Sequence, residues 1–275
     1  METTFQALIM GIVQGLTEFL PVSSSGHLVI VPYLLGWTDP FITSLEFSVM
    51  LHLGTLVALL IYFWRDWLVI VPAGFATLRD RSFRGDPNRR LAWLLVVATI
   101  PAVVAGPILN DRLEATIRTA EDVAIALVIG AAILWLADQV GRKTVEVEKV
   151  SFPLALGIGI AQSIALVPGI SRAGMSISAG LFAGLTREAA ARFSFLMATP
   201  VIAGAGLFEA RNLVAGEAGV AVPIGPLLVG MVAALVSGLL AITVMLRFVR
   251  THSYGIFVAD RLVVAGLVLV AFLAR

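Results

Sequence analysis

The sequence QGLTEFLPVSSSGH, residues 14–27, interrupts a strongly apolar segment with polar side chains. Glu18 follows Gln14 by four residues, so both side chains would face the same side of a helix. Pro21 disfavours helical geometry at the residue before it, which predicts that this helix ends there. A second helix that begins near Ser25 would direct its partly positive N-terminus toward the gap. A carboxylate, hydroxyls, backbone N–H groups and an imidazole would therefore converge at one place.

Apolar residues dominate the whole chain. Hydrophobic residues make up 59% of the 275 positions and charged residues only 13%, about half the charged share of a soluble domain. This composition indicates an integral membrane protein with several spans. The chain has no cysteine, which excludes disulfides, thiolate chemistry and Cys-ligated metals. The net charge of +1 gives no indication of nucleic-acid binding.

The apolar runs predict six membrane spans and two pairs of shorter segments. In each pair, a polar break separates two runs that fall short of the roughly 20 residues of a span. Each pair is therefore expected to form a re-entrant helical hairpin, with its break surrounded by protein or a wet cavity. The expected spans are 47–64, 91–109, 122–140, 193–210, 222–246 and 256–274, and the hairpins combine 5–20 with 28–36 and 152–167 with 175–185. Residues 65–90, which hold six arginines, are expected to form an exposed loop, and 110–121 and 141–151 are expected to be polar connections.

The two hairpins begin two halves that repeat each other at an offset of 148 residues. Four pairs of residues match in register: Gly11 with Gly159, Gln14 with Gln162, Ser23 with Ser171, and Gly26 with Gly174. Each half holds one hairpin and three spans, and this odd number of spans inverts the second half. Inverted repeats place their broken helices near the membrane midplane, facing each other. The expected organisation is one membrane domain, residues 1–275, made of inverted repeats at approximately 1–148 and 149–275.

Basic residues are distributed unevenly among the expected connections. Loops 65–90, 141–151, 186–192 and 247–255 fall on one side and hold six, three, two and two basic residues. The loops on the other side hold fewer. The side rich in arginine and lysine should be cytoplasmic, which places both termini outside.

Arg172 lies in the second polar break, which reads PGISRAG over residues 168–174. An isolated cation in apolar surroundings is costly, so Arg172 should pair with an anion or line a wet cavity. One interpretation is a structural ion pair with Glu18. The other is binding of an anionic substrate, because a guanidinium offers forked donors that suit phosphate.

The polar residues of the first break also have alternative interpretations. Glu18 is able to bind a divalent metal or act as an acid or base, or it is paired for stability alone. His27 is either a capping or core histidine or a proton-transfer group. Serines 23–25 either cap the second helix or supply a nucleophile activated with His27. Gln14 offers a neutral carbonyl that suits a metal. The residues alone indicate a midplane site for an anion, with phosphate favoured.

Three further ionisable residues lie in the expected spans or at their beginnings. Glu46 and Arg192 begin corresponding spans, and helix capping or ion pairing is favoured over chemistry for both. His52 lies about one and a half turns into a span and ranks low as a residue that lines the cavity.

The motifs QGLTEFLPVSSSGHL and PGISRAG resemble the two signature stretches of the undecaprenyl-diphosphate phosphatase family, the bacitracin-resistance proteins. The resemblance runs the length of the chain and includes LHLGTLVAL and ARFSFLMATP. It implies an enzyme of the bacterial cytoplasmic membrane that removes the terminal phosphate of undecaprenyl diphosphate and recycles the carrier for peptidoglycan synthesis. It also implies an inverted repeat of six spans and two re-entrant hairpins, a site open to the outer face, and Mg²⁺ or Ca²⁺. A homodimer is a further expectation.

The resemblance carries roles to individual residues. Glu18 and His27 match the essential glutamate and histidine, and Arg172 matches the phosphate-binding arginine. Ser24 matches the serine proposed as nucleophile, for which the histidine is the alternative. Glu18 is also the expected metal ligand. The expected substrate-binding residues are Gln14, Ser23, Ser25, Gly26, Ser171, Ala173, Gly174 and Ser176.

Three positions depart from the family pattern. Gln14 stands where some members carry a second glutamate, which puts a two-carboxylate metal site in doubt. Ala173 replaces the usual serine, and Ser48 replaces an acidic residue. A transporter or flippase for a polyprenyl phosphate is the alternative function, because inverted repeats with broken helices are typical of transporters. The cluster of a serine, a histidine and a glutamate favours hydrolysis, since transport needs no nucleophile.

Overall fold

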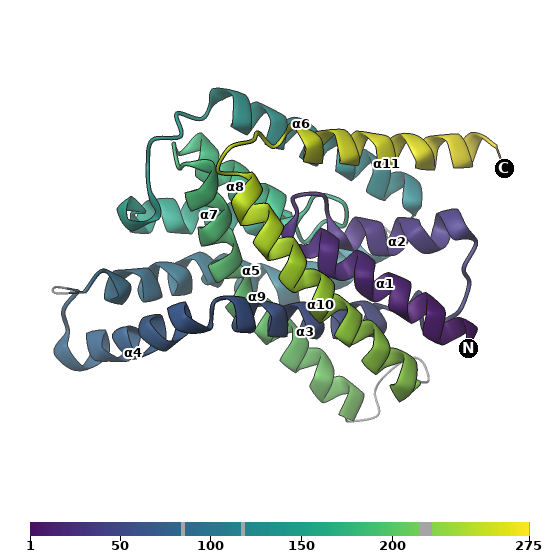
Figure 1. Ribbon diagram of the computed structural model, residues 1–275, viewed down its shortest axis with the longest axis horizontal. Helices are drawn as coiled ribbons and strands as arrows, with labels where there is room; N and C mark the ends of the chain where they lie inside the picture. The colour runs from purple at the N-terminus through teal and green to yellow at the C-terminus, as the bar shows by residue number, and fades with distance from the viewer. Residues whose placement is uncertain (84–85, 117–118, 215–221, 275) are drawn as a thin grey trace.

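Helices make up the fold in this computed structural model, which describes residues 1–83, 86–116, 119–214 and 222–274 (Figure 1). Within those ranges no strand is present, and the one isolated β-bridge joins Val145 to Leu185. The elements in chain order are α1 (Glu2–Phe19), α2 (Ser24–Leu35), α3 (Leu45–Tyr62), α4 (Trp64–Asp80), α5 (Pro87–Thr116), α6 (Ala120–Val140), the 3₁₀ helix η1 (Val147–Lys149), α7 (Phe152–Ile164), α8 (Arg172–Phe182), α9 (Arg187–Val214), α10 (Ile224–Phe248) and α11 (Gly255–Leu273).

Six of the described helices are long and apolar enough to cross a membrane, namely α3, α5, α6, α9, α10 and α11. They correspond in order to the six predicted spans, which confirms the all-α polytopic membrane class. Several helices extend beyond the predicted limits. Helix α5 continues to Thr116 and α9 already begins at Arg187, so much of the connections expected at 110–121 and 186–192 is helical. Polar helix ends that project past the apolar run account for this difference.

The two predicted hairpins correspond to the pairs α1–α2 and α7–α8. Residues 20–23 join the first pair and residues 165–171 join the second. Leu20 ends α1 in an extended conformation (φ −72°, ψ 140°), as expected of a residue before proline. Helix α2 has 12 residues and α8 has 11, too short to cross a hydrocarbon core of about 30 Å at 1.5 Å per residue. Entry and exit of each pair at one membrane face stays a prediction.

Each hairpin packs against a span of the other half. Helix α1 packs along α10, as Figure 1 shows, and α7 packs along α5. A methyl group at Gly11 of α1 would collide with the carbonyl of Gly230, and one at Gly159 of α7 would collide with the carbonyl of Ala98. Gly11 and Gly159 are also matched in the sequence repeat. The two glycines thus allow the same close helix packing in each half, and the inverted repeat stays a prediction.

The prediction of an exposed loop at 65–90 is wrong for most of its length, because Trp64–Asp80 form α4. Ile70, Ala73 and Thr77 are its buried residues, and their spacing of three and four places them on one helix face. That face packs against α5. The arginines are typical of the polar side of an amphipathic helix, and the apolar residues at helical spacing form the side that packs.

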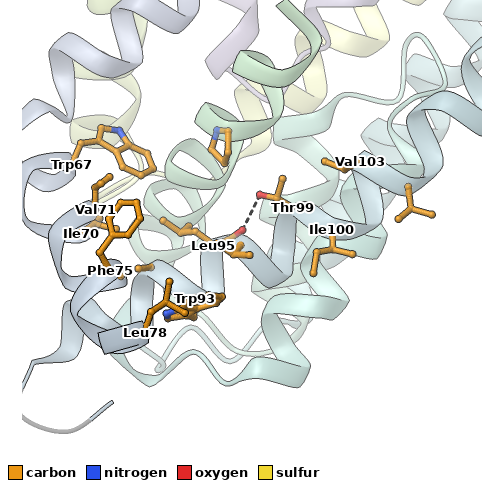
Figure 2. A pocket seen from close by; sticks show the side chains of 15 residues that line it. Trp67, Ile70, Val71, Phe75, Leu78, Trp93, Leu95, Thr99, Ile100 and Val103 are labelled. Atoms are coloured by element: carbon orange, nitrogen blue, oxygen red, sulfur yellow. Dashed lines mark hydrogen bonds between the residues drawn. The ribbon is translucent and has the colours of Figure 1, made fainter. Parts of the chain in front are cut away.

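A pocket of about 530 Å³ lies between α4 and α5, and Pro200 of α9 also lines it (Figure 2). Apolar side chains from both helices line it, including Trp67 and Phe75 from α4 and Trp93 from α5. The hydroxyl of Thr99 also faces this region, but it donates to the Leu95 carbonyl (2.8 Å) within its own helix. The pocket thus contains none of the polar residues of the two breaks.

The buried carboxylate of Asp138 links the end of α6 to the beginnings of α9 and α11 by hydrogen bonds. Asp138 of α6 is 4% exposed and accepts a hydrogen bond from Nε of Arg187 at 2.7 Å. It also accepts one from the backbone N–H of Tyr254 at 3.0 Å. Burial and the nearby Asp138 carboxylate raise the pKa of the Tyr254 hydroxyl, which stays protonated and donates to the Arg187 carbonyl (3.1 Å).

Candidate active site

The two breaks have the same local construction. Ser23 precedes α2 with φ 77° and Ser171 precedes α8 with φ 78°. Each serine caps its helix by accepting a hydrogen bond from a glycine three residues on, Gly26 (3.3 Å) and Gly174 (3.0 Å). A positive φ is uncommon for serine and costs conformational energy, and such strain clusters at functional sites. Both breaks therefore hold a fixed, strained turn at a helix N-terminus.

The breaks lie against each other inside the protein. A Cβ at Gly26 would lie 3.4 Å from the Cα of Gly169, across the gap between the halves. Both positions are buried. The N-termini of α2 and α8, which begin at these breaks, consequently lie near one another and offer unpaired backbone N–H groups to an anion.

Glu18 is the centre of the polar cluster between the breaks. Glu18 is 7% exposed, and side chains from α1, α2, α3 and α8 contact its carboxylate oxygens. Oε1 forms an ion pair with Arg172. Oε2 accepts hydrogen bonds from Gln14 Nε2 (3.0 Å) and Ser24 Oγ (2.5 Å), and it lies 3.3 Å from His52 Nε2. A buried carboxylate needs such partners to remain ionised.

The Ser24 hydroxyl contacts the Glu18 carboxylate, and the role of Ser24 as a nucleophile stays a prediction. The hydroxyl donates to Glu18 Oε2, so a carboxylate is in position to take the proton when the oxygen attacks. The sequence left both Glu18 and His27 open as the base. In the structure, Ser24 contacts Glu18. Ser24 is the first residue of α2, and Glu18 lies in the last turn of α1.

Arg172 brings the second half of the chain into the cluster. It is the first residue of α8, and one of its guanidinium nitrogens, Nη2, pairs with Glu18. The structural ion pair considered above is therefore present. Binding of phosphate by the remaining donors of the fork stays a prediction.

His27 lies at the edge of the cluster and faces another helix. Its Nδ1 is 2.8 Å from the Ser23 carbonyl oxygen. Because a carbonyl only accepts, this contact assigns the proton to Nδ1 in the neutral ring. Nε2 lies 3.7 Å from Oδ2 of Asp260 on α11. The polar contacts of His27 therefore lead to Ser23 and Asp260 rather than to Ser24 and Glu18.

Comparison with known proteins shows the family to which this chain belongs. The family model described as bacitracin resistance protein BacA matches residues 7–267. The chain belongs to the BacA family. Proteins named undecaprenyl-diphosphatase are similar over nearly their whole length. The protein from Desulforudis audaxviator is 44% identical over 98% of both chains, that from Moorella thermoacetica 40% over 99% of both, and that from Gemmatimonas aurantiaca 43% over 99% of this chain and 98% of the relative. The predicted family is confirmed.

Two predicted substrate-binding serines of this BacA-family chain have partners within the protein. Ser176 bonds the Arg172 carbonyl (2.8 Å) and the Ser194 hydroxyl (2.6 Å), so it joins α8 to α9. Ser25 Oγ lies 3.4 Å from Ser23 Oγ beside the first break. Ala173 lies in the first turn of α8 and is buried. Substrate contacts of these residues, and of the capping residues described above, stay predictions.

Three residues around the cluster were missed or ranked too low in the sequence. His52 of α3 contacts Glu18, and its Nδ1 is 2.7 Å from the Ser48 carbonyl oxygen. Asp260 and Arg261 both lie in α11. Both fall within the expected span 256–274. Ionisable residues inside spans are rare and mark functional positions, a signal that was available for all three.

The polar cluster fits a metal only if the substrate supplies further ligands. No group of three or more His, Cys, Asp or Glu side chains able to hold an ion occurs in the described ranges. However, Oε1 of Gln14 is buried without a hydrogen-bond partner among those residues, next to the Glu18 carboxylate. Mg²⁺ is commonly held by one or two protein oxygens together with substrate phosphates and water. Glu18 and Gln14 provide oxygens of the right type.

Arg192 has a structural role, as the sequence favoured. It pairs with Asp66 at the beginning of α4, and its guanidinium carbon lies 5.8 Å from the ring centroid of Phe63. This ion pair joins α9 to α4, away from the residues of the two breaks.

Proposed function

We propose that this chain is an integral membrane phosphatase that hydrolyses undecaprenyl diphosphate to undecaprenyl phosphate and inorganic phosphate. Membership of the BacA family and the name shared by its relatives support this activity. One observation carries this proposal: the Ser24 hydroxyl donates a hydrogen bond to Oε2 of Glu18, and Arg172 forms an ion pair with Oε1 of the same carboxylate. The reaction returns the lipid carrier to peptidoglycan synthesis and confers resistance to bacitracin.

The diphosphate would bind where the two breaks meet. The N-termini of α2 and α8 would supply backbone N–H donors and the positive ends of two helix dipoles. Arg172 would add forked, charged donors to the phosphate oxygens. A charge of this kind placed in protected surroundings stabilises the transition state of phosphoryl transfer more than it would in water.

In the first step, Ser24 Oγ would attack the terminal phosphorus in line with the bridging oxygen. A bond forms between Oγ and phosphorus, and the bond from phosphorus to the bridging oxygen breaks. The serine proton passes to Glu18, and undecaprenyl phosphate leaves with the bond's electron pair on its oxygen. A water molecule then attacks the phosphoserine, releases phosphate and restores the hydroxyl. His27, held by Ser23 and Asp260, is the alternative nucleophile or proton carrier.

A divalent cation, Mg²⁺ or Ca²⁺, is part of the proposal. Glu18, as the expected metal ligand, and the unpaired Oε1 of Gln14 would hold it together with phosphate oxygens. When bound, the ion would neutralise charge on the diphosphate. Gln14 Nε2, by donating to Glu18 at 3.0 Å, fixes the direction in which Oε1 points.

The protein is a multi-pass protein of the bacterial inner membrane, and its finer placement is proposed. Met1 and the C-terminal end of α11 lie toward the same end of the molecule (Figure 1), which agrees with both termini lying on one side of the membrane. We propose that this side is the outer one and that the site opens to the outer face. A homodimer is also proposed. Because the chain has no cysteine, single cysteines at Thr3 and at Arg250 offer a topology test. Labelling of intact cells by an impermeant maleimide at Thr3→Cys, but not at Arg250→Cys, is expected.

Phosphate release tests the activity. Detergent-purified wild type should release phosphate from undecaprenyl diphosphate with Mg²⁺ or Ca²⁺, and Ser24→Ala should lose it. Ser163→Ala is the matched control, since the Ser163 hydroxyl donates to the Gly159 carbonyl within α7 at 3.0 Å and should leave the rate unchanged. Absence of release from folded wild type would contradict the proposal. It would favour the transporter alternative, which family membership disfavours.

A further inference from the structure

Arg261 of α11 reaches both breaks at once. It is among the largest fully buried side chains, at 0% exposure. Nε donates to the Pro21 carbonyl at 2.6 Å, and Nη1 donates to the Ile170 carbonyl at 3.2 Å. Pro21 belongs to the break between α1 and α2, and Ile170 to the break between α7 and α8. One guanidinium thus satisfies backbone carbonyls from both halves of the chain where the helices are interrupted.

Two glycines leave room for this side chain. A methyl group at Gly130 of α6 would collide with Nη1 of Arg261, and one at Gly174 of α8 would collide with Nη2. Gly174 is also the residue that donates to the Ser171 cap. The side chain therefore fits a space formed by α6, α8 and α11, and a larger residue at either glycine would displace it.

Burial of Arg261 costs free energy that a role in stability alone does not explain. Nη2 of Arg261 is buried and has no hydrogen-bond partner among the residues that the structure describes. A buried donor without a partner destabilises the folded state, and more so when the group is charged. Buried ionic side chains are often replaced by apolar ones with little loss of stability. A role beyond stability accounts for an arginine at this position.

We propose that Arg261 is a positioning residue that holds the two breaks in register. This inference rests on the proposed function. Ser24 follows Pro21 by three residues, and Arg172 follows Ile170 by two. The nucleophile and the phosphate-binding arginine are thus each placed by a loop whose carbonyl Arg261 holds. A misplacement of about 1 Å at a reacting group lowers the rate by about 100-fold.

Kinetics of Arg261 variants test the proposal. Arg261→Met removes the donors while keeping a long side chain, and Arg261→Lys keeps the charge and reaches one carbonyl. We expect a loss in kcat of about 100-fold for Arg261→Met, with KM changed by less than about threefold because binding groups remain. Arg261→Lys should lie between wild type and Arg261→Met. Retention of wild-type kcat by folded Arg261→Met would overturn the proposal.

Arg187→Met is the matched control for a structural effect. Arg187 also pairs within a buried network, with Asp138 at 2.7 Å, but it contacts neither break. This variant should lower thermal stability and leave kcat per folded molecule unchanged. If Arg261→Met does not fold, Arg261→Lys and Gly130→Ala decide the question, since both keep a buried cation. Full turnover in both would overturn the proposal.

A distance measurement separates this inference from the proposed function. The cysteine-free chain accepts spin labels at Leu34→Cys in α2 and Ile164→Cys in α7, and both native side chains are exposed. The distance distribution between the labels should be narrow in wild type and broad in Arg261→Met. An unchanged distribution would overturn the proposal, whatever the enzyme assay shows. Wild type without phosphatase activity but with the expected broadening would contradict the proposed function alone.

Discussion

The Ser24 hydroxyl donates a hydrogen bond of 2.5 Å to Oε2 of Glu18. Short O–H···O contacts of this kind are typical of a hydroxyl paired with an ionised carboxylate. Because Glu18 lies in the last turn of α1 and Ser24 begins α2, the four-residue break between the helices brings the two side chains together. The proposed nucleophile and its proposed base are therefore aligned by a local feature of the chain.

Glu18→Gln should nearly abolish turnover. The substitution keeps the size of the side chain but removes the base, and a general base contributes about 10²–10⁴-fold to the rate. It also leaves Arg172 without its anionic partner, so a lower melting temperature is expected. Phosphate release and thermal unfolding in detergent measure the two effects. Glu188→Gln, which removes a carboxylate paired with Arg250 at the surface, is the control and should change neither phosphate release nor the melting temperature. Equal activity of the Glu18 and Glu188 variants would refute the role of Glu18.

Arg172→Ala should lower kcat/KM by about 100–1,000-fold, the cost of losing one strong donor from a charge-stabilising site. Arg172→Lys should recover only part of this loss, because a lysine cannot present the fork. Steady-state kinetics with undecaprenyl diphosphate measure the effect. Arg250→Lys at the exposed pair with Glu188 is the control. Full activity of Arg172→Lys would show that the fork is not used.

Removal of divalent cations should stop phosphate release, and added Mg²⁺ or Ca²⁺ should restore it. Gln14→Glu adds a second carboxylate beside Glu18 and should lower the metal concentration that gives half-maximal activity, because carboxylates bind these ions better than amides do. Titration of activity with metal after chelator treatment measures this concentration. Activity that survives exhaustive chelation would contradict the metal proposal.

The positive φ of Ser171 allows a test of the capped turn. Ser171→Ala loses the cap to Gly174 and keeps an unfavourable φ, whereas Ser171→Gly loses the cap but relieves the strain. Ser171→Ala should therefore be less stable than Ser171→Gly by about 1 kcal/mol. Thermal unfolding of both variants provides the comparison. A glycine variant that is the less stable of the two would show that the turn is not strained.

Much of the fold could be predicted from the sequence because membrane spans have strong signals. Length and apolar composition placed the six spans, and Pro21 correctly marked the end of α1. The sequence also offered an ion pair between Arg172 and Glu18, because an isolated cation there is costly, and the structure contains this pair. The spans and the end of α1 depend on residues that are close in sequence.

The rest depended on packing that the sequence pattern does not specify. The arginines of residues 65–90 predict an exposed loop, whereas the helical spacing of Ile70, Ala73 and Thr77 in α4 gives a face that packs on α5. His52 was ranked low, and its contact with Glu18 requires the position of α3 relative to α1. The orientation of His27 toward Asp260 likewise depends on α11, more than 230 residues away in sequence. Long-range pairs of this type emerge only when the helices are assembled.

The most direct test of the central claim is to identify the phosphorylated residue during turnover. Wild type mixed with undecaprenyl diphosphate labelled in the terminal phosphate, and quenched within one turnover, should carry the label on Ser24 when its peptides are examined by mass spectrometry. Ser24→Ala should carry no label and release no phosphate. A label on His27, or phosphate release by Ser24→Ala at the wild-type rate, would contradict the account of Ser24 as the nucleophile.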